Sequence, residues 1–139
     1  MILLDTNVLS ALMRQKPDVE VVRWLDRQPR TSVWTTAITV FEIRSALQVM
    51  ATGKRQLALM ASFEYLLTEL IQQRVAAFDS AAAQRAADLT AVRQKLGLSV
   101  ELRDTMIAGI TIATHATLAT RNTRHFEDVS CPIVNPWQS

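Results

Sequence analysis

Residues 1–10 read MILLDTNVLS, an apolar run that breaks at Asp5-Thr6-Asn7 and then resumes. The apolar residues 2–4 indicate a short buried strand, and the spacing of the apolar residues after the break indicates a helix. Asp5 therefore follows the carboxyl end of a strand. In sheets of parallel strands the functional crevice lies at these carboxyl ends, so a carboxylate here indicates a site. The alternative is that Asp5 only caps the helix that follows it.

Strands and helices alternate through the rest of the chain. Short runs of apolar, aromatic and β-branched side chains predict strands at residues 32–36, 74–78, 117–120 and 132–135. Helical spacing and capping residues predict helices at residues 19–28, 38–50, 54–71, 80–95 and 105–115. This alternation is typical of the α/β class, and we expect an α/β/α sandwich with a mainly parallel central sheet.

The composition indicates one soluble domain. The chain has 139 residues, of which 49% are hydrophobic, so one sizeable core can form and we expect a single domain over residues 1–139. The amino terminus lacks the basic region of a signal peptide. The longest weakly polar stretch, residues 106–120, falls short of the roughly 20 apolar residues that span a bilayer. We therefore expect a cytoplasmic protein without a membrane segment.

Residue counts exclude a disulfide-linked fold and a structural zinc site. Cys131 is the only cysteine, so no internal disulfide can form, and one cysteine with two histidines does not build a structural zinc site. We interpret Cys131 as a small buried side chain. The formal net charge of +2 is too small to indicate a nucleic-acid-binding protein by itself. Any basic surface must therefore be local.

Two more polar residues fall where they can meet Asp5. Asn122 comes just past the predicted strand 117–120, and Asp104 stands immediately before the helix that leads into that strand. Asp104 alone has the same alternative as Asp5, a helix N-cap. Its helix, however, is apolar all the way round, which indicates a buried element whose first residues are buried too. A carboxylate in that position needs a partner.

Glu42 is the third acidic candidate. On its helix the polar arc is marked by Arg44, Ser45 and Gln48. Glu42 falls on the apolar side, between Ala46 and Val49, whereas a helical glutamate usually lies on a solvated face. Burying an ionised carboxylate costs several kcal/mol unless it is paired or binds a cation. Glu42 is therefore predicted to belong to the site.

A divalent cation is the partner that suits three such carboxylates. Asp5, Glu42 and Asp104 would repel one another and raise each other's pKa values unless a cation kept them ionised. Carboxylate oxygens without a nearby histidine or cysteine select a hard metal ion. We therefore expect Mg²⁺ or Mn²⁺.

Four segments of the chain resemble one protein family. DTNVLS from Asp5, TVFEIRSAL around Glu42, RDTMIAGI around Asp104 and ATRNTRHFE around Asn122, with a closing IVNPW, are similar to the PIN-domain nucleases, specifically the VapC-type toxins of bacterial toxin–antitoxin pairs. The resemblance covers essentially the whole chain. It implies a PIN-like sandwich and a metal-dependent endoribonuclease with Asp5, Glu42 and Asp104 as acidic site residues. It also implies a cognate, small, DNA-binding antitoxin as partner.

One position departs from the family pattern. The fourth site position, often acidic in the wider family, is Asn122 here, so the site is less negative and holds a second metal weakly or not at all. Thr120, two residues earlier, offers a hydroxyl to the same site. In the expected mechanism a cation on Asp5 and Asp104 polarises the phosphate and activates a water. Glu42 orients that water or binds a second ion, and Asn122 positions a water or phosphate oxygen.

Arginines accompany each site segment. They are Arg44, Arg103, Arg121 and Arg124. Cations beside a cluster of catalytic carboxylates suit an RNA phosphodiester backbone, and we expect Arg44, Arg121 and Arg124, with Thr120, to bind the substrate. The alternative for each arginine taken singly is that it balances local charge or faces solvent. Their shared association with the site segments favours the binding role.

Two other functions share part of this sequence pattern. Phosphatase and phosphoacceptor domains also have an aspartate after the first strand. A phosphatase of the haloacid type needs a second aspartate where Asn7 stands, and a phosphoacceptor (receiver) domain needs a lysine after a late strand, which is missing here. A catalytically silent RNA- or protein-binding PIN-like domain remains as the alternative. The apolar helices leave surface for an antitoxin or a second copy, and we expect a homodimer within a larger toxin–antitoxin complex.

Overall fold

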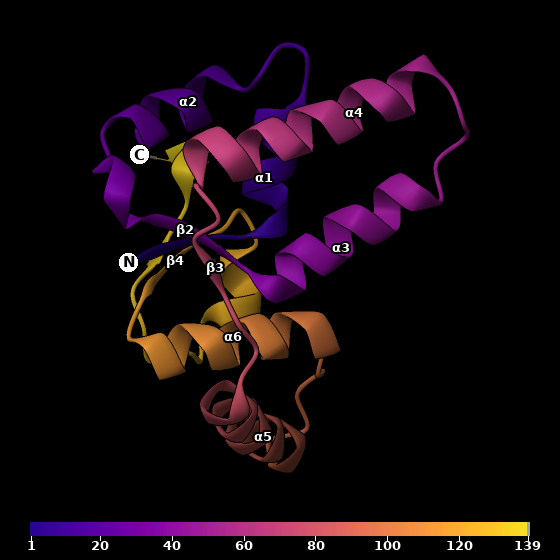
Figure 1. The fold of residues 1–139 in the computed structure, drawn as a ribbon. Coiled ribbons are helices and arrows are strands. Elements are labelled where there is room, and N and C mark those ends of the chain that lie inside the picture. Colours follow the sequence, from indigo (N-terminus) through magenta and orange to yellow (C-terminus); the bar gives the residue numbers. More distant parts are fainter. Residues whose placement is uncertain (139) are drawn as a thin grey trace.

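The fold is built on a parallel sheet at the centre of the molecule (Figure 1). The structure is a computed structural model and describes residues 1–138. Its strands are β1 (Ile2–Leu4), β2 (Val33–Thr36), β3 (Val75–Ala76), β4 (Thr117–Ala119) and β5 (Ile133–Val134). They lie in the order β3-β2-β1-β4-β5, and every pair of neighbours is parallel. The predicted parallel sheet is confirmed.

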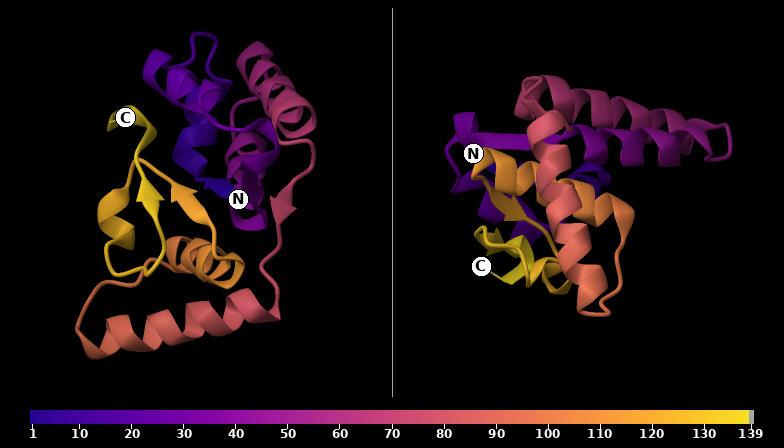
Figure 2. Two further views of the ribbon diagram at one scale, coloured as in Figure 1. Left: turned by 90° about the vertical axis from the view of Figure 1, so that its left-hand side faces the viewer. Right: turned by 90° about the horizontal axis from the view of Figure 1, so that it is seen from below.

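Helices cover both faces of the sheet (Figures 1 and 2). The helices are α1 (Thr6–Met13), α2 (Val19–Asp26), α3 (Ala37–Gln48), α4 (Lys54–Tyr65), α5 (Ser80–Lys95) and α6 (Leu102–Thr114). Short turns lie at η1 (Arg30–Ser32), η2 (Leu66–Leu70), η3 (Thr123–Phe126) and η4 (Pro136–Gln138). The α/β/α sandwich is thus confirmed, with α3 and α4 extending from its body as a hairpin (Figure 2).

The first strand shows why both faces are covered. Leu3 and Leu4 are both fully buried, and consecutive strand residues point to opposite faces. Leu4 belongs to the hydrophobic cluster that α1–α4 build, and Leu3 belongs to the cluster beneath α5 and α6. A strand that is apolar on both sides can only be central. That central place puts Asp5, the next residue, in the middle of the sheet's carboxyl edge.

On the second face, α5 lies across α6 as an outer layer (Figure 2). The two helices approach closely because α6 carries Gly109 against Ala82 and Ala86 of α5. A β-carbon at position 109 would stand 2.5 Å from the Ala82 carbonyl oxygen and 2.8 Å from the Ala86 Cβ. Small residues therefore set the position of α5, whose last turns reach the candidate site.

Several boundaries differ from the sequence prediction. Helix α6 begins at Leu102, three residues earlier than expected, because Glu101 accepts from the Asp104 N–H and serves as the N-cap. Strand β3 has two paired residues rather than five. The predicted helix over 54–71 is α4 followed directly by the short π-helix η2. Cys131, expected to be buried, is half-buried.

Two predictions concern the limits of the chain. The single domain over residues 1–139 stays a prediction, and its last residue, Ser139, lies outside the described residues. Within residues 1–138, none of the helices has the length and apolarity needed to cross a bilayer.

Candidate functional site

Asp5 is the most enclosed of the three candidate carboxylates, with 4% of its surface exposed. Its Oδ1 accepts from the Thr6 N–H at 2.8 Å, so it does cap α1. Its Oδ2 accepts from the Thr120 hydroxyl at 2.7 Å. Burial raises the pKa of Asp5 to about 6, against the opposing effect of these hydrogen bonds, and the nearby Asp104 and Glu42 raise it further. Asp5 therefore both caps α1 and has the raised pKa expected of a functional carboxyl group.

Thr120 and Asn7 hold Asp5 in place. Thr120 follows β4 and is fully buried, so its hydroxyl serves Asp5 and does not face a substrate. Asn7 donates from Nδ2 to Asp5 Oδ2 and to Thr120 Oγ1, at 3.4 Å each. Its Oδ1 accepts from the Arg121 N–H at 3.0 Å. The sequence prediction missed Asn7, for which the only signal was its place two residues after Asp5.

Glu42 lies on α3, with 19% of its side chain exposed. Its Oε1 accepts from the Thr6 hydroxyl at 3.1 Å, and its Oε2 lies 3.5 Å from Arg103 Nη1. The expectation that Glu42 avoids the solvated face therefore agrees with the structure, but the reason given for it was wrong. Ala46 and Val49 are exposed, and the buried side of α3 is formed by residues such as Ile43 and Leu47.

Asp104 lies in the first turn of α6, not before it, with 19% of its side chain exposed. Its Oδ2 lies 2.6 Å from Nδ1 of His125, a residue that the sequence prediction did not single out although it stands in the RNTRHFE segment. Asp104 Oδ1 accepts no hydrogen bond from residues 1–138, so one carboxylate oxygen is free for a ligand.

A partly buried ion pair fixes the turn that carries His125. Arg93, at the end of α5, is 5% exposed and donates to both carboxylate oxygens of Asp128 at 2.8 Å, to the Thr105 hydroxyl at 3.0 Å and to the His125 carbonyl oxygen at 2.9 Å. The hydrogen bonds between Arg93 and Asp128 lower the pKa of Asp128 and raise that of Arg93. The outer helix α5 thereby positions η3 against Asp104.

The three carboxylates interact, but they do not form a closed cage. Within residues 1–138 no group of three or more His, Cys, Asp or Glu side chains converges tightly enough to hold a metal ion. Glu42 and Asp104 face Arg103 and His125 instead. The chemistry of Asp5, Glu42 and Asp104 still fits a hard cation, because their ligand atoms are carboxylate oxygens. In addition, the buried carboxylate of Asp5 has no cationic partner within residues 1–138.

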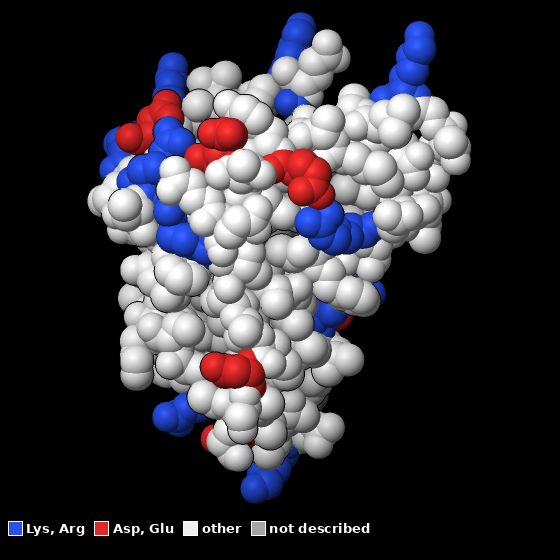
Figure 3. All heavy atoms as spheres, in the orientation of Figure 1, with Lys and Arg blue, Asp and Glu red and all other residues white. Residues whose placement is uncertain are grey.

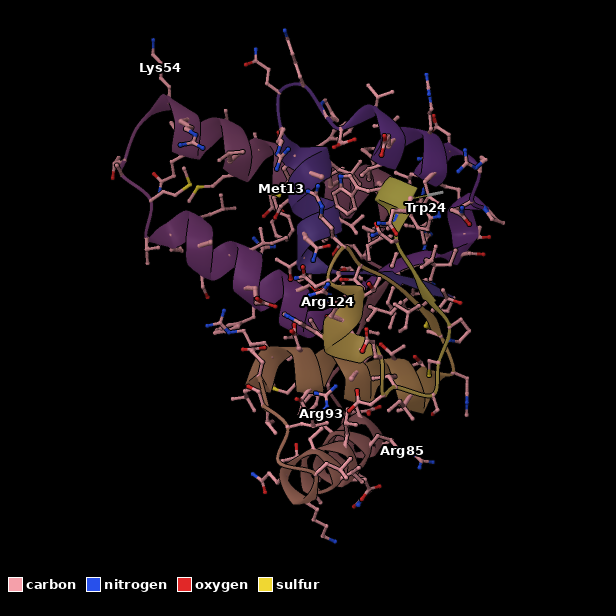
Figure 4. The ribbon with its side chains drawn as sticks, turned by 180° about the vertical axis from the view of Figure 1, so that it is seen from behind. Met13, Trp24, Lys54, Arg85, Arg93 and Arg124 are labelled. Carbon is pink, nitrogen blue, oxygen red and sulfur yellow. The ribbon has the colours of Figure 1, made fainter. Side chains whose placement is uncertain are left out.

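Of the polar residues predicted to contact substrate, Asn122 and Arg124 are exposed beside the site. Asn122 immediately precedes η3, and its backbone N–H donates to Thr120 Oγ1 at 3.0 Å. Arg124 lines a cavity of about 350 Å³ together with Asp104 and His125. Figure 4 shows Arg124 on η3, between α1 on one side and α6 on the other.

Arg44 lies elsewhere. Its Nη1 is 2.6 Å from Glu64 Oε1 on α4, and its guanidinium lies over the ring of Phe63. On the face drawn in Figure 3, Lys and Arg side chains form a group at the upper left and lie scattered elsewhere, with acidic side chains among them. The substrate role predicted for Arg44 has no support in this geometry, and the cations beside the site are Arg103, Arg121 and Arg124.

Comparisons with known proteins agree on one family. The model of the PIN domain family matches residues 2–130. Plasmid stability protein StbB of Pseudomonas syringae pv. tomato is 39% identical over 139 residues, covering 100% of both chains. VapC ribonuclease Y4jK of Sinorhizobium fredii is 37% identical, covering 99% of both chains. Toxin FitB of Neisseria gonorrhoeae is 34% identical, covering 99% of both chains.

Solved structures give the same picture. The structure of FitAB bound to an IR36 DNA fragment superposes with a TM-score of 0.89 at 33% identity, covering 100% of this chain and 97% of that chain. The likeness therefore extends from the sheet to the helices around it.

Proposed function

The chain belongs to the PIN domain family, and we propose that it is the ribonuclease toxin of a toxin–antitoxin pair, cleaving RNA phosphodiester bonds with the help of Mg²⁺ or Mn²⁺. One observation carries the proposal. Asp5 lies at the carboxyl edge of the sheet, where burial raises its pKa to about 6 and Asp104 and Glu42 add smaller contributions in the same direction. A strongly perturbed carboxyl group with acidic neighbours is typical of a catalytic centre.

Asp5, Asp104 and Glu42 are the residues that would hold the cation. When bound, it supplies Lewis-acid stabilisation of charge on the phosphate and a lower pKa for an attacking water. Asp5 is the fixed carboxylate, because Thr6 and Thr120 hold its two oxygens. Asp104 contributes its free Oδ1.

Glu42 and Asn122 complete the arrangement around the reacting phosphate. Glu42 is held by the Thr6 hydroxyl and is placed to orient a water. The exposed amide of Asn122 can donate to and accept from a water or a phosphate oxygen. Because Asn122 adds no negative charge, the site suits one cation better than two. Arg121 and Arg124 then contact the RNA backbone.

A groove beside Glu42 supports an antitoxin as partner. It has a volume of about 410 Å³, lies between α1, α3 and α4, and is continued by a hollow of about 640 Å³ toward Lys54. Its apolar lining includes Met13, Leu47, Met50 and Leu59, and its basic lining includes Arg14, Arg55 and Arg103. Figure 4 shows Met13 on α1 and Lys54 at the tip of the α3–α4 hairpin. An amphipathic acidic segment fits this groove, and a basic residue at its end could pair with the carboxylates.

The same hairpin supports a homodimer. Four large hydrophobic side chains of the α3–α4 hairpin, on the two helices and at the end of α3, are more than half exposed: Phe41, Val49, Leu57 and Tyr65. We propose that a second copy of the chain covers part of this surface within a larger toxin–antitoxin complex.

The partner is tested in cells. Expressed alone, the wild-type chain should arrest growth and the Asp5→Asn form should not. Co-expression of the small open reading frame beside the gene should restore growth, and its product should copurify. A lone wild-type protein that is folded, abundant and harmless would remove the toxin assignment.

A silent RNA- or protein-binding domain is the second candidate. It is favoured by the neutral Asn122 and by the orientation of Glu42 toward Arg103 and of Asp104 toward His125. The deciding experiment is cleavage of bulk RNA with and without Mg²⁺ or Mn²⁺. We expect metal-dependent cleavage by the wild type, none by Asp5→Asn, and normal cleavage by the matched control Glu64→Gln, which removes an exposed carboxylate on α4. RNA binding without cleavage in every metal would favour the silent domain.

A further inference from the structure

The C-terminal turn η4 fixes an aromatic ring near the candidate site. Trp137 packs against α2 and the cluster of α1–α4, and Figure 1 shows the C-terminal end beside α2. The indole Nε1–H donates to Asp18 Oδ2 at 3.0 Å, and the backbone N–H of Trp137 donates to Asn135 Oδ1 at 2.9 Å. Asp18 is itself fixed, because its Oδ1 caps α2 through the Glu20 N–H. The ring therefore has a defined orientation.

Arg121 lies over one face of this ring. Its guanidinium carbon is 4.7 Å from the centroid of the Trp137 ring. The backbone N–H of Arg121 donates to Asn7 Oδ1, and Asn7 donates in turn to Asp5. Two hydrogen bonds therefore connect the backbone of Arg121 to the buried carboxylate.

The donors of Arg121 are uncommitted. Within residues 1–138 its guanidinium takes part in no hydrogen bond and no ion pair, whereas Arg44 and Arg103 face Glu64 and Glu42. Stacking on an aromatic ring occupies the face of a guanidinium and leaves its in-plane N–H groups free. Those groups match two oxygens of a phosphate. The stack also restricts a side chain that otherwise loses about 2 kcal/mol of rotamer entropy on binding.

We propose that Trp137 is a positioning residue for RNA binding: its indole holds the guanidinium of Arg121 at the edge of the site, where Arg121 contacts a phosphate of the substrate strand. The inference rests on the proposed ribonuclease function and adds the C-terminal turn to the RNA-binding surface. Trp137 acts through Arg121 and does not itself touch the reacting atoms.

The test is RNA affinity, measured separately from cleavage. A fluorescent single-stranded RNA of mixed sequence is titrated with the full chain in EDTA, by anisotropy, from 50 to 300 mM KCl. For Arg121→Gln we expect affinity to fall about tenfold, as for loss of a hydrogen bond to a charged group. The slope of log K against log[salt] should flatten by about 0.7, as for one lost contact to a single strand. Arg85→Gln, an exposed arginine of α5 labelled in Figure 4, is the matched control and should change neither quantity.

A double-mutant cycle tests the role of Trp137. Trp137→Leu should weaken RNA binding about threefold or more in the presence of Arg121 and have almost no effect in the Arg121→Gln background. Trp137→Phe, which keeps an aromatic face, should recover most of the loss. If Trp137→Leu does not fold, the same cycle is run with Trp137→Phe, which should then show a smaller, still non-additive effect.

The outcomes separate this inference from the function. Additive effects of the two substitutions, or an unchanged salt slope in Arg121→Gln, would overturn the positioning role while leaving metal-dependent RNA cleavage intact. A wild-type chain that neither binds nor cleaves RNA would overturn both.

Discussion

Replacing Asp5 by asparagine should change how the stability of the protein depends on pH. The pKa of Asp5 is about 6 in the folded protein, whereas an unperturbed aspartate, as in the unfolded chain, has a pKa of 3.8. The folded chain therefore binds this proton more tightly than the unfolded chain. The contribution of Asp5 to the free energy of unfolding is therefore most favourable below pH 4. It falls as the pH rises from about 4 to about 6 and is constant above that.

The magnitude follows from the two pKa values. Because one pKa unit corresponds to about 1.4 kcal/mol, ionised Asp5 costs the folded state on the order of 3 kcal/mol at neutral pH. About 2 kcal/mol of this develops between pH 4.5 and pH 7.5. Asparagine is neutral throughout and keeps an acceptor for the Thr6 N–H, while its amide disturbs the bond from Thr120 by about 1 kcal/mol at every pH. The difference in stability between Asp5→Asn and the wild type should therefore move in favour of the variant by about 2 kcal/mol over this range.

Urea denaturation of both proteins in EDTA, at constant ionic strength, measures this difference at pH 4.5, 5.5, 6.5 and 7.5. Glu64→Gln is the control, because it removes an exposed carboxylate whose change should leave the pH profile nearly parallel to that of the wild type. A difference between Asp5→Asn and the wild type that stays constant with pH would show that Asp5 titrates normally, and the electrostatic argument for the site would fall with it.

Three further predictions concern the cation, Glu42 and the helix contact. Millimolar Mg²⁺ or Mn²⁺ should raise the melting temperature of the wild type according to RT ln(1 + [L]/Kd), and Asp104→Asn should lose most of the gain; identical wild-type melting curves with and without metal would count against the site. Glu42→Gln keeps the shape of the side chain and its contact with Thr6, and it loses only the weak ion pair with Arg103. The free energy of unfolding should therefore change by less than about 1 kcal/mol, while RNA cleavage should be almost abolished. Strong destabilisation with normal cleavage per folded molecule would show that Glu42 is a structural residue. Gly109→Ala should destabilise the protein by about 1–3 kcal/mol in urea denaturation, because the new methyl group meets the Ala82 carbonyl oxygen; a neutral result would mean that α5 can move away from α6.

The sequence alone determined the fold and the location of the candidate site. Leu3 and Leu4 are apolar on both sides of one strand, and the helices keep their apolar spacing, so the parallel sandwich and the place of Asp5 could be predicted. Burial leaves a periodic pattern along the chain, and that pattern can be read without coordinates. The position of Glu42 was also predicted, although its true neighbours on the buried side of α3 were not.

Only the tertiary structure decided which partners these residues have. Asn7 meets the Arg121 N–H across 114 residues and Trp137 meets Asp18 across 119, while His125 pairs with Asp104 across 21. Such contacts depend on the strand order, which places β4 beside β1, and on the rotamers that packing selects. These contacts follow no period in the sequence, so secondary-structure propensity and residue spacing do not predict them. The sequence shows only which carboxylates and arginines are present. Their hydrogen bonds, and the ring that orients Arg121, exist only once the sheet has brought distant segments to one edge.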